Sequence, residues 1–323
     1  MVVASRETVL MRVSRRVLEA DGIVGIELRS LDVSDLMPWP PGAHIELLLE
    51  PGLSRQYSLC GDPLDRHAYH IAVLREPQSR GGSELVHLKL QVGAEIEVRG
   101  PRNNFELDSE RDDYLFIAGG IGITPIKAMV ESLSAEGRPW RLHYGGRTTS
   151  SMAFVDQLRA LPHGAVTLTP EDERGRLDVD AILASTGSEA VVYCCGPEGL
   201  IEAVRESAAR RGLDVHFERF GAVSDAAEAE LRGGLERFVV ELRRSGVEVE
   251  VGPEETILDA VRTVDTGVPS SCEDGYCGTC ETTVLGGAPL HRDSVLTPAE
   301  QAAGESMMIC VGRSCSERLV LDI

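Results

Sequence analysis

The sequence has no apolar run that approaches the roughly 18–20 residues a membrane-spanning helix needs. The first six residues also lack the basic-then-apolar build of a secretory signal peptide, so we expect a cytoplasmic protein. Positive charge is scarce, because 32 Lys and Arg face 52 Asp and Glu, for a net charge of −20. A surface this acidic repels phosphate backbones and anionic lipids, which disfavours nucleic-acid and membrane partners. The acidity either steers the chain toward a basic protein partner or only aids solubility.

Eight cysteines stand out against these absences. Disulfides do not persist in a reducing compartment, so metal or redox chemistry explains the cysteines better than a disulfide scaffold does. The 323 residues, 42 % of them apolar, are enough for two or three compact domains.

The pattern of strands and turns divides the chain into three predicted domains and a linker. Residues 1–107 read as short strands separated by Gly and Pro turns, which predicts an antiparallel β-barrel. Residues 108–222 alternate apolar strands with amphipathic helices that end at Gly137 and Gly212, which predicts a parallel α/β domain. Residues 223–235 read as a linker, and residues 236–323 form a third unit with further strands and a helix from Thr256. The runs expected as strands are 8–13, 23–28, 44–49, 55–59, 70–74, 95–98, 114–118, 141–144, 190–194, 237–242 and 247–251.

Four cysteines in the third unit have the spacing of a plant-type [2Fe–2S] site. Cys272, Cys277 and Cys280 form a C-x4-C-x2-C segment, and Cys310 follows with 29 residues between. Gly275 and Gly278 (in the same segment) let backbone N–H groups approach the cluster sulfides. A four-cysteine zinc site is the alternative, although such sites usually show two short paired spacings. We expect Cys315 to be a buried bystander.

Two segments of the barrel predict a phosphate and a planar ring. On the strand that contains Arg55, Tyr57 and Ser58, an arginine can fork onto a phosphate and a tyrosine can stack on a ring. Arg80-Gly81-Gly82-Ser83 precedes a short helix, and glycines followed by serine at a helix start form an anion cradle. A capped turn without a ligand is the alternative.

Two segments of the α/β domain predict a dinucleotide. Gly119-Gly-Ile-Gly-Ile-Thr-Pro125 joins a strand to a helix, with Thr124 as the expected N-cap and Pro125 as the first helical residue, although the string is not the G-x-G-x-x-G fingerprint. Cys194-Cys195-Gly196-Pro197 ends a later parallel strand, where ligands bind. We expect Cys194 in the core and Cys195 near a nicotinamide ring.

These motifs, in this order, resemble the ferredoxin–NADP reductase superfamily, which has R-x-Y-[ST], G-G-x-G-x-T-P and C-G-P motifs. A C-terminal plant-type ferredoxin domain, of the β-grasp class, is similar to the phthalate dioxygenase reductases and the reductases of vanillate O-demethylases. The resemblance covers nearly the whole chain. It implies that the flavin is FMN and that the electron acceptor is a Rieske-type oxygenase.

The resemblance also implies roles for single residues. Arg55 and Ser83 would hold the FMN phosphate, and Phe220 would cover the flavin ring. Acid after the strand that follows Arg147 favours NADH over NADPH, although Arg147 and Arg174 keep NADPH possible. The implied hydride-transfer residues are Ser58, Cys195 and Phe220. The implied cofactor-binding residues are Arg55, Tyr57, Ser58, Ala72, Val73, Gly81, Gly82, Ser83, Gly119, Gly120, Gly122, Thr124, Arg147, Asp172, Cys195, Gly196, Pro197 and Phe220.

The expected reaction is hydride transfer from NADH to FMN, followed by transfer of single electrons through the cluster to an oxygenase. The chain is expected to be a monomer. Two alternatives stay open: a reductase for another acceptor, such as a cytochrome-type oxygenase or a small molecule, and a non-catalytic redox module that only binds flavin.

Overall fold

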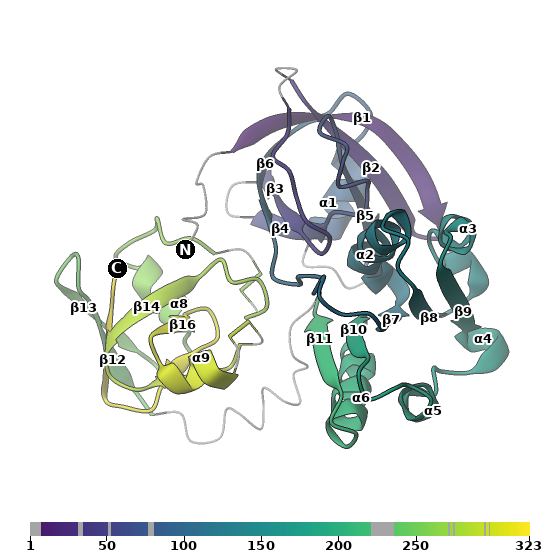
Figure 1. Cartoon of the computed structure of the whole chain (residues 1–323). Helices are drawn as coiled ribbons and strands as arrows, with labels where there is room; N and C mark the ends of the chain where they lie inside the picture. Colours follow the sequence, from purple (N-terminus) through teal and green to yellow (C-terminus); the bar gives the residue numbers. More distant parts are fainter. Residues whose placement is uncertain are drawn as a thin grey trace. The chain divides into compact units, whose positions relative to one another are not determined.

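The computed structural model describes residues 8–31, 35–50, 53–76, 81–220, 236–270, 272–273, 275–293, 295–296 and 298–323. The chain folds into two compact units, Met1–Phe220 and Gly221–Ile323 (Figure 1). The predicted linker and Arg80 lie outside the described residues. Among the described residues, no helix is long and apolar enough to cross a membrane.

The first part of unit 1 is a curled six-stranded antiparallel sheet in the order β4-β3-β6-β1-β2-β5, across which β1 arches in Figure 1. Its strands are β1 (Val9–Ala20), β2 (Ile23–Ser30), β3 (His44–Glu50), β4 (Leu53–Ser58), β5 (Tyr69–Leu74) and β6 (Glu95–Arg102). The edge strands β4 and β5 are joined by a bridge between Leu59 and Ile71, so the sheet closes into the expected barrel at that point. Helix α1 (Gly82–Lys89) contacts both edge strands, and Val86 on this helix packs into the barrel core.

The second part of unit 1 is a five-stranded parallel sheet in the order β11-β10-β7-β8-β9, which confirms the predicted α/β architecture. Its strands are β7 (Tyr114–Gly119), β8 (Trp140–Gly146), β9 (Gly164–Pro170), β10 (Val191–Cys195) and β11 (Asp214–Glu218). The chain runs from β7 outward to β9 and then returns to β10 on the other side of β7. The crevice between the carboxyl ends of β7 and β10 is therefore the topological switch point, where ligands bind in such sheets.

Helices cover both faces of the parallel sheet because alternate strand residues point to opposite sides. They are η1 (Gly120–Gly122), α2 (Ile123–Ala135), η2 (Thr149–Ser151), α3 (Val155–Ala160), α4 (Glu171–Arg174), α5 (Val179–Ala184) and α6 (Glu198–Ala209). Phe116 and Tyr193 pack toward α2, whereas Ile117 and Cys194 pack toward α5 and α6. The core position expected for Cys194 is therefore confirmed, and burial raises the pKa of its thiol to about 12.

The predicted start of α2 is wrong. The turn η1 leads directly into the helix, whose N-cap is Gly122, and Thr124 already lies inside the first turn. The Thr124 hydroxyl donates to the Ile121 carbonyl 3.0 Å away, so it satisfies an acceptor in the preceding turn and does not cap the helix. The predicted end is confirmed, because Gly137 has a left-handed φ of 73° and the Arg138 N–H donates to the Leu133 carbonyl.

Unit 2 is a mixed sheet in the order β13-β12-β18-β14-β16, packed against α8. Its elements are β12 (Phe238–Leu242), β13 (Val247–Val251), α8 (Ile257–Arg262), β14 (Glu281–Gly286), β15 (Pro289–Leu290), α9 (Pro298–Ala303), β16 (Ser306–Met308), β17 (Arg313–Ser314) and β18 (Arg318–Leu321). The predicted helix start is confirmed, because the Thr256 side chain accepts from the Asp259 N–H. Buried Arg313 ties the unit together by donating to the carbonyls of Gly252 and Glu255.

Candidate functional site

The first part of the site lies where α1 bridges the edges of the barrel. Gly81, the N-cap of α1, has a left-handed φ of 90°, and no side chain caps the helix there. A Cβ at Gly82 would lie 2.5 Å from Cγ of Arg55, so the arginine lies directly against the helix start. Uncapped N–H groups beside a guanidinium fit a phosphate, as the sequence predicts.

Ser83 supports this turn through its backbone neighbours. Its hydroxyl accepts from the Glu76 N–H 3.1 Å away, which connects the end of the β5 region to α1. Arg55 also donates to the Ser54 carbonyl at 2.7 Å, which orients its guanidinium along β4. The structure therefore brings together Arg55, Gly82 and Ser83, three of the residues predicted to hold a flavin phosphate.

The other barrel residues of the predicted flavin site differ in what they can offer. Tyr57 is half-buried against the barrel core, and burial raises the pKa of its hydroxyl, so the phenol stays neutral. The side chains of Ala72 and Val73 are buried in hydrophobic cores. The Val73 carbonyl oxygen lies within hydrogen-bond distance of His87 Nε2, at 2.9 Å.

At the switch point, the two nicotinamide motifs interlock backbone against backbone. A Cβ at Gly122 would lie 2.3 Å from the Cys195 carbonyl oxygen, and one at Gly196 would lie 2.9 Å from Cα of Gly119. A Cβ at Gly119 would also lie 2.6 Å from Cδ of Pro197. These glycines are therefore required for close approach, and they hold the two motifs as one surface.

Gly120 is different, because a Cβ there would meet nothing within 4 Å and its φ is 54°. The turn is thus open at Gly120 and closed at its neighbours, which fits a pyrophosphate cradle at the start of α2. Thr124, which was also expected to contact the dinucleotide, is 1 % exposed and points back at Ile121. The structure does not present its side chain to a ligand.

Three side chains meet where the barrel faces the parallel sheet. Ser58 Oγ on β4 donates to Glu218 Oε2 on β11 across 3.2 Å. Cys195 pairs with Glu218 in the register between β10 and β11, and it is fully buried. Burial and then the nearby Glu218 charge raise the pKa of the Cys195 thiol, so it stays protonated.

Glu218 is a site residue that the sequence analysis missed. Its side chain keeps some solvent contact but is closely surrounded by protein, and burial raises its pKa to about 8, with the Ser58 hydrogen bond opposing the shift. In the sequence Glu218 stands between Phe217 and Arg219 at the end of a short strand, a pattern that does not by itself mark a site. Phe220, two residues later, is 38 % exposed, so core packing does not explain it.

The predicted adenosine side of the dinucleotide site also comes together. The Asp172 N–H donates to the Arg147 carbonyl at 3.1 Å, which joins the end of β8 to α4. Thr149 Oγ1 donates to Glu173 at 3.2 Å and holds the same acidic turn. The acids thus follow β9 as the sequence predicts.

In unit 2 the four predicted cluster ligands converge and are buried. The thiol of Cys272 lies beside those of Cys277 and Cys310, and the thiol of Cys310 also lies beside that of Cys280. Four converging cysteine thiolates are the donor set that a [2Fe–2S] cluster takes, two thiolates to each iron.

The backbone around these thiols is shaped by glycine. Gly275 and Gly278 have left-handed φ values of 73° and 74°, and a Cβ at Gly275 would lie 2.6 Å from Val311 Cγ2. Left-handed backbone favours glycine at both positions, and the predicted approach of their N–H groups to the cluster sulfides stays a prediction. The expectation for Cys315 is half wrong: it lies outside the cluster, but it is exposed, because it follows the edge strand β17.

Comparisons with known proteins agree with this arrangement. Residues 116–206 match the oxidoreductase NAD-binding domain, and residues 240–315 match the 2Fe-2S iron-sulfur cluster binding domain. The chain is 46 % identical over 99 % of both chains to phenoxybenzoate dioxygenase subunit beta of Ectopseudomonas oleovorans. Its structure matches phthalate dioxygenase reductase with a TM-score of 0.71 and 35 % identity over 98 % of both chains.

A further structural match is an intact type IV self-sufficient cytochrome P450 monooxygenase, with a TM-score of 0.88 and 42 % identity. That match covers 98 % of this chain, which spans 41 % of the length of the P450 protein. Fold, site and matches together define an oxidoreductase with NAD-binding and [2Fe–2S] domains. The chain belongs to the phthalate dioxygenase reductase family, and its matched domains are those that bind NAD and a [2Fe–2S] cluster.

Proposed function

We propose that the chain is the reductase component of a Rieske-type oxygenase system. The observation that carries this proposal is the end-to-end match with a dioxygenase subunit, which covers 99 % of both chains. The flavin, nicotinamide and cluster motifs all stand in this one chain, so it carries each part needed to turn a two-electron donor into a source of single electrons. We further propose the domain limits 1–107, 108–222, 223–235 and 236–323 expected from the sequence.

Different residues of the site would hold the phosphate and the ring of FMN. Arg55, Gly81, Gly82 and Ser83 would bind the FMN phosphate, while Tyr57 and Phe220 would enclose its ring. When bound, FMN would supply the chemistry that converts a two-electron hydride donor into a source of single electrons for the cluster. The chain contributes orientation and exclusion of water, and no protein nucleophile is needed.

Glu218 and Ser58 would hold a proton beside the flavin. Because burial raises the pKa of Glu218 to about 8, the carboxyl group is largely neutral at pH 7. A neutral group does not oppose the negative charge that a hydride brings into the site. Cys195, buried beside Glu218, would act through shape and not as a thiolate.

The dinucleotide is proposed to be NADH. The backbone hydrogen bond from Asp172 to Arg147 holds an acidic turn where the adenosine ribose would bind. A carboxylate there would accept a hydrogen bond from a free 2′-hydroxyl and repel a 2′-phosphate. We expect kcat/KM to favour NADH over NADPH by about tenfold or more, which corresponds to at least ~1.4 kcal/mol. Equal values for both dinucleotides would remove this assignment.

Reconstitution with candidate oxygenases tests the proposed acceptor. Purified protein and NADH are mixed with a Rieske oxygenase and, in parallel, with a P450 that lacks its own reductase, and product is measured. The proposal expects NADH-dependent product with a Rieske oxygenase. A P450 is the second candidate, because 98 % of this chain matches part of a self-sufficient P450 protein; product only with the P450 would favour it.

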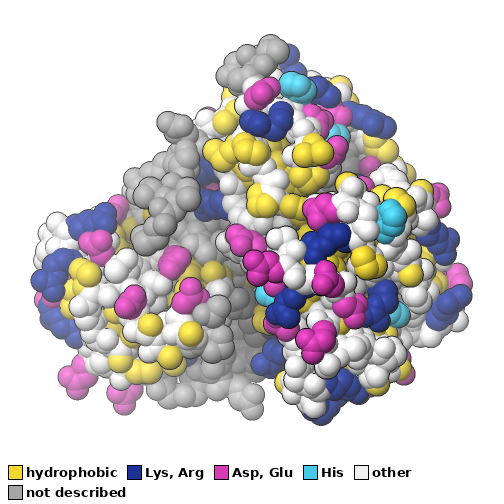
Figure 2. Space-filling view, viewed as in Figure 1, with side chains coloured by type: hydrophobic (Ala, Val, Ile, Leu, Met, Phe, Trp, Pro, Cys, Tyr) yellow, Lys and Arg dark blue, Asp and Glu magenta, His cyan; other side chains and the backbone are white. Residues whose placement is uncertain are grey.

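We also propose that the protein works as a cytoplasmic monomer. Among the described residues no two cysteines form a disulfide, which fits a reducing compartment. On the face drawn in Figure 2, acidic and basic side chains are interspersed over the described parts of the surface, as is usual for a soluble exterior. Light scattering of the holoprotein that gives twice the mass of one chain would contradict the monomer.

A further inference from the structure

Arg219 stands between the two residues that end unit 1 at the flavin side, Glu218 and Phe220. Its Nη1 donates to Glu198 at 2.7 Å and its Nη2 donates to Glu202 at 2.6 Å, and its side chain is only 10 % exposed. The guanidinium also lies 5.3 Å from the centre of the Phe217 ring. One buried arginine thus bridges two carboxylates on α6.

The two carboxylates are placed for this contact by the helix itself. Glu198 and Glu202 are four residues apart, so they project from the same side of α6. Burial raises the pKa of Glu198, and Arg219 is the charge that most strongly opposes this shift. The pairing therefore compensates a partly buried acid, and an arginine fork holds its geometry more firmly than a lysine would.

Successive side chains point to opposite sides of the extended segment that carries Arg219. In an extended strand, Phe217 and Arg219 face one side, toward α6, while Glu218 faces the other, toward Ser58. Glu198 directly follows Pro197 of the nicotinamide motif, so α6 begins where that motif ends. The Arg219 bridge therefore ties the Cys195–Pro197 turn to the segment that carries Glu218 and Phe220.

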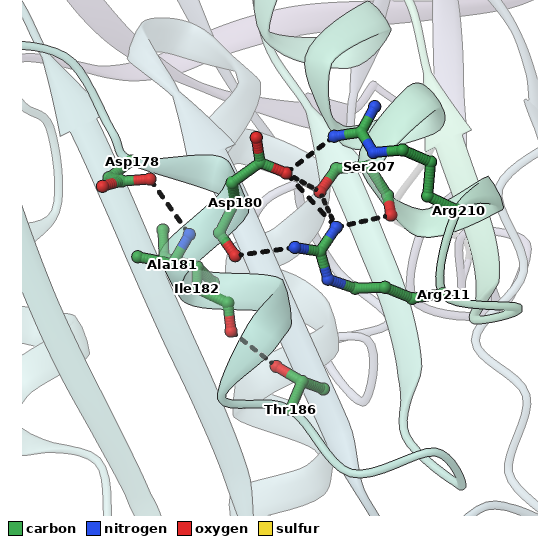
Figure 3. A network of polar contacts seen from close by, with 8 residues as sticks. All are labelled: Asp178, Asp180, Ala181, Ile182, Thr186, Ser207, Arg210 and Arg211. Carbon is green, nitrogen blue, oxygen red and sulfur yellow. Dashed lines mark hydrogen bonds and ion pairs between the residues drawn. The ribbon is translucent and has the colours of Figure 1, made fainter.

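The opposite end of α6 is fixed as well, as Figure 3 shows. Arg210 and Arg211 donate to the Asp180 carboxylate on α5 at 2.7 and 3.2 Å, and Ser207 donates to the same oxygen. These contacts hold the last turn of α6 against α5, so the helix has a second attachment besides Arg219. Movement of Arg219 would thus shift the short segment around it and leave the helix in place.

We propose that Arg219 is a positioning residue for hydride transfer, which holds the nicotinamide turn and the flavin-covering segment in one fixed arrangement through Glu198 and Glu202. Arg219 would act through these two carboxylates and not by contact with a cofactor. The inference rests on the proposed roles of Glu218 and Phe220 in the reductase.

The test compares R219Q with two matched variants of the holoprotein. R205Q removes another arginine from Glu202, at a side chain that is 58 % exposed. R210Q removes one contact at the far end of α6, where Ser207 and Arg211 still hold Asp180. For R219Q we expect kcat with NADH and ferricyanide to fall about tenfold, with KM changed by less than about threefold, because misplacement affects the reacting geometry more than binding. R205Q and R210Q are expected to stay within about twofold of the parent protein.

A spectroscopic readout separates positioning from loss of stability. The visible absorption of bound FMN responds to the aromatic ring that stacks on it, so the flavin band of R219Q should shift while the cluster midpoint potential does not. Parent kcat together with an unshifted flavin band in R219Q would overturn the inference.

Two further variants keep the outcome decisive. If R219Q loses its cofactors, E198Q is measured instead, because the Arg219–Glu202 contact remains; a reduced kcat and a shifted band are again expected, and parent values overturn the inference. F220A tests the underlying role separately. If F220A leaves both kcat and the flavin band unchanged, the proposed role of Phe220 fails, whatever R219Q shows.

Discussion

Ser58 Oγ and Glu218 Oε2 lie 3.2 Å apart, although 160 residues separate them along the chain. The serine belongs to the barrel strand with the flavin motif, and the glutamate ends the last strand of the parallel sheet. This hydrogen bond connects the two parts of unit 1 at the place where a hydride would pass.

Glu218→Gln should remove a pH dependence from NADH oxidation. The pKa of Glu218 is raised to about 8, so its neutral form prevails below that pH, and its ionisation above it places a negative charge beside the hydride acceptor. Turnover of the parent protein with ferricyanide is expected to fall as pH rises through about 8, and that limb should be absent in E218Q.

The raised pKa of Glu218 also affects stability. A carboxyl whose pKa is higher in the folded than in the unfolded protein stabilises the fold at low pH, and this contribution is lost as pH rises toward 8.

E206Q, which changes an exposed glutamate on α6, is the matched control for the turnover measurement and should keep the pH profile of the parent protein's turnover. A parent-like limb in E218Q would assign that limb to another group.

Gly122→Ala should destabilise the switch point. The added Cβ would lie 2.3 Å from the Cys195 carbonyl oxygen, and backbone cannot move away as a flexible side chain can. We expect a loss of about 2–4 kcal/mol in the free energy of unfolding and weaker NADH binding. Chemical denaturation and NADH titration measure the two effects.

Gly199→Ala is the matched control for that substitution. Gly199 lies in α6, and a Cβ there would meet nothing within 4 Å, so alanine should stabilise the helix by roughly 0.5–1 kcal/mol. A similar loss in both variants would mean that crowding at Gly122 is not the cause.

Lys127→Met should destabilise the contact between the barrel and α2. Lys127 is 6 % exposed, and its Nζ donates to the Cys60 carbonyl at 2.9 Å and to Glu131 at 2.6 Å. Removing the cation leaves a partly buried carboxylate and a carbonyl without their donor, which costs about 2–4 kcal/mol. Thermal unfolding of K127M and K127M/E131Q tests this, since the double variant should recover part of the loss.

The fold could be predicted largely because the relevant signals are local. Alternating strands, the apolar run at Tyr114–Ala118 and the glycines that end α2 and α6 each fix their own element. The start of α2 was misplaced because threonine and proline are good N-terminal residues, while the η1 turn that displaced them depends on close contact between Gly122 and Cys195. Such a contact spans two distant segments and leaves no local pattern.

The parts of the site that have a local sequence pattern were predictable, and those that depend on distant partners were not. The cysteines and glycines were found because their spacing reflects covalent and steric requirements. Glu218 and Arg219 were missed because their partners, Ser58 and the acids on α6, become neighbours only after folding. Ala72, Val73 and Thr124 are expected at the cofactors, but their side chains are buried, because the direction in which strand and helix residues face depends on tertiary packing.

Cys277→Ser should separate the two halves of the reaction. Cys277 is buried among the cluster ligands, so the variant should lose reduction of a protein acceptor yet keep NADH-to-ferricyanide turnover within about threefold, because that turnover needs only the flavin. C315S, at an exposed cysteine outside the cluster, should keep both activities. Equal loss of both activities in C277S would place the cluster elsewhere than after the flavin.

Anaerobic titration of the purified protein with NADH, followed by its visible absorption, tests the central claim most directly. The account predicts a brown-red protein in which NADH bleaches both the flavin and the iron–sulfur absorption, with two irons per chain by metal analysis. A yellow protein that carries zinc, or an iron–sulfur absorption that NADH leaves unchanged, would contradict it.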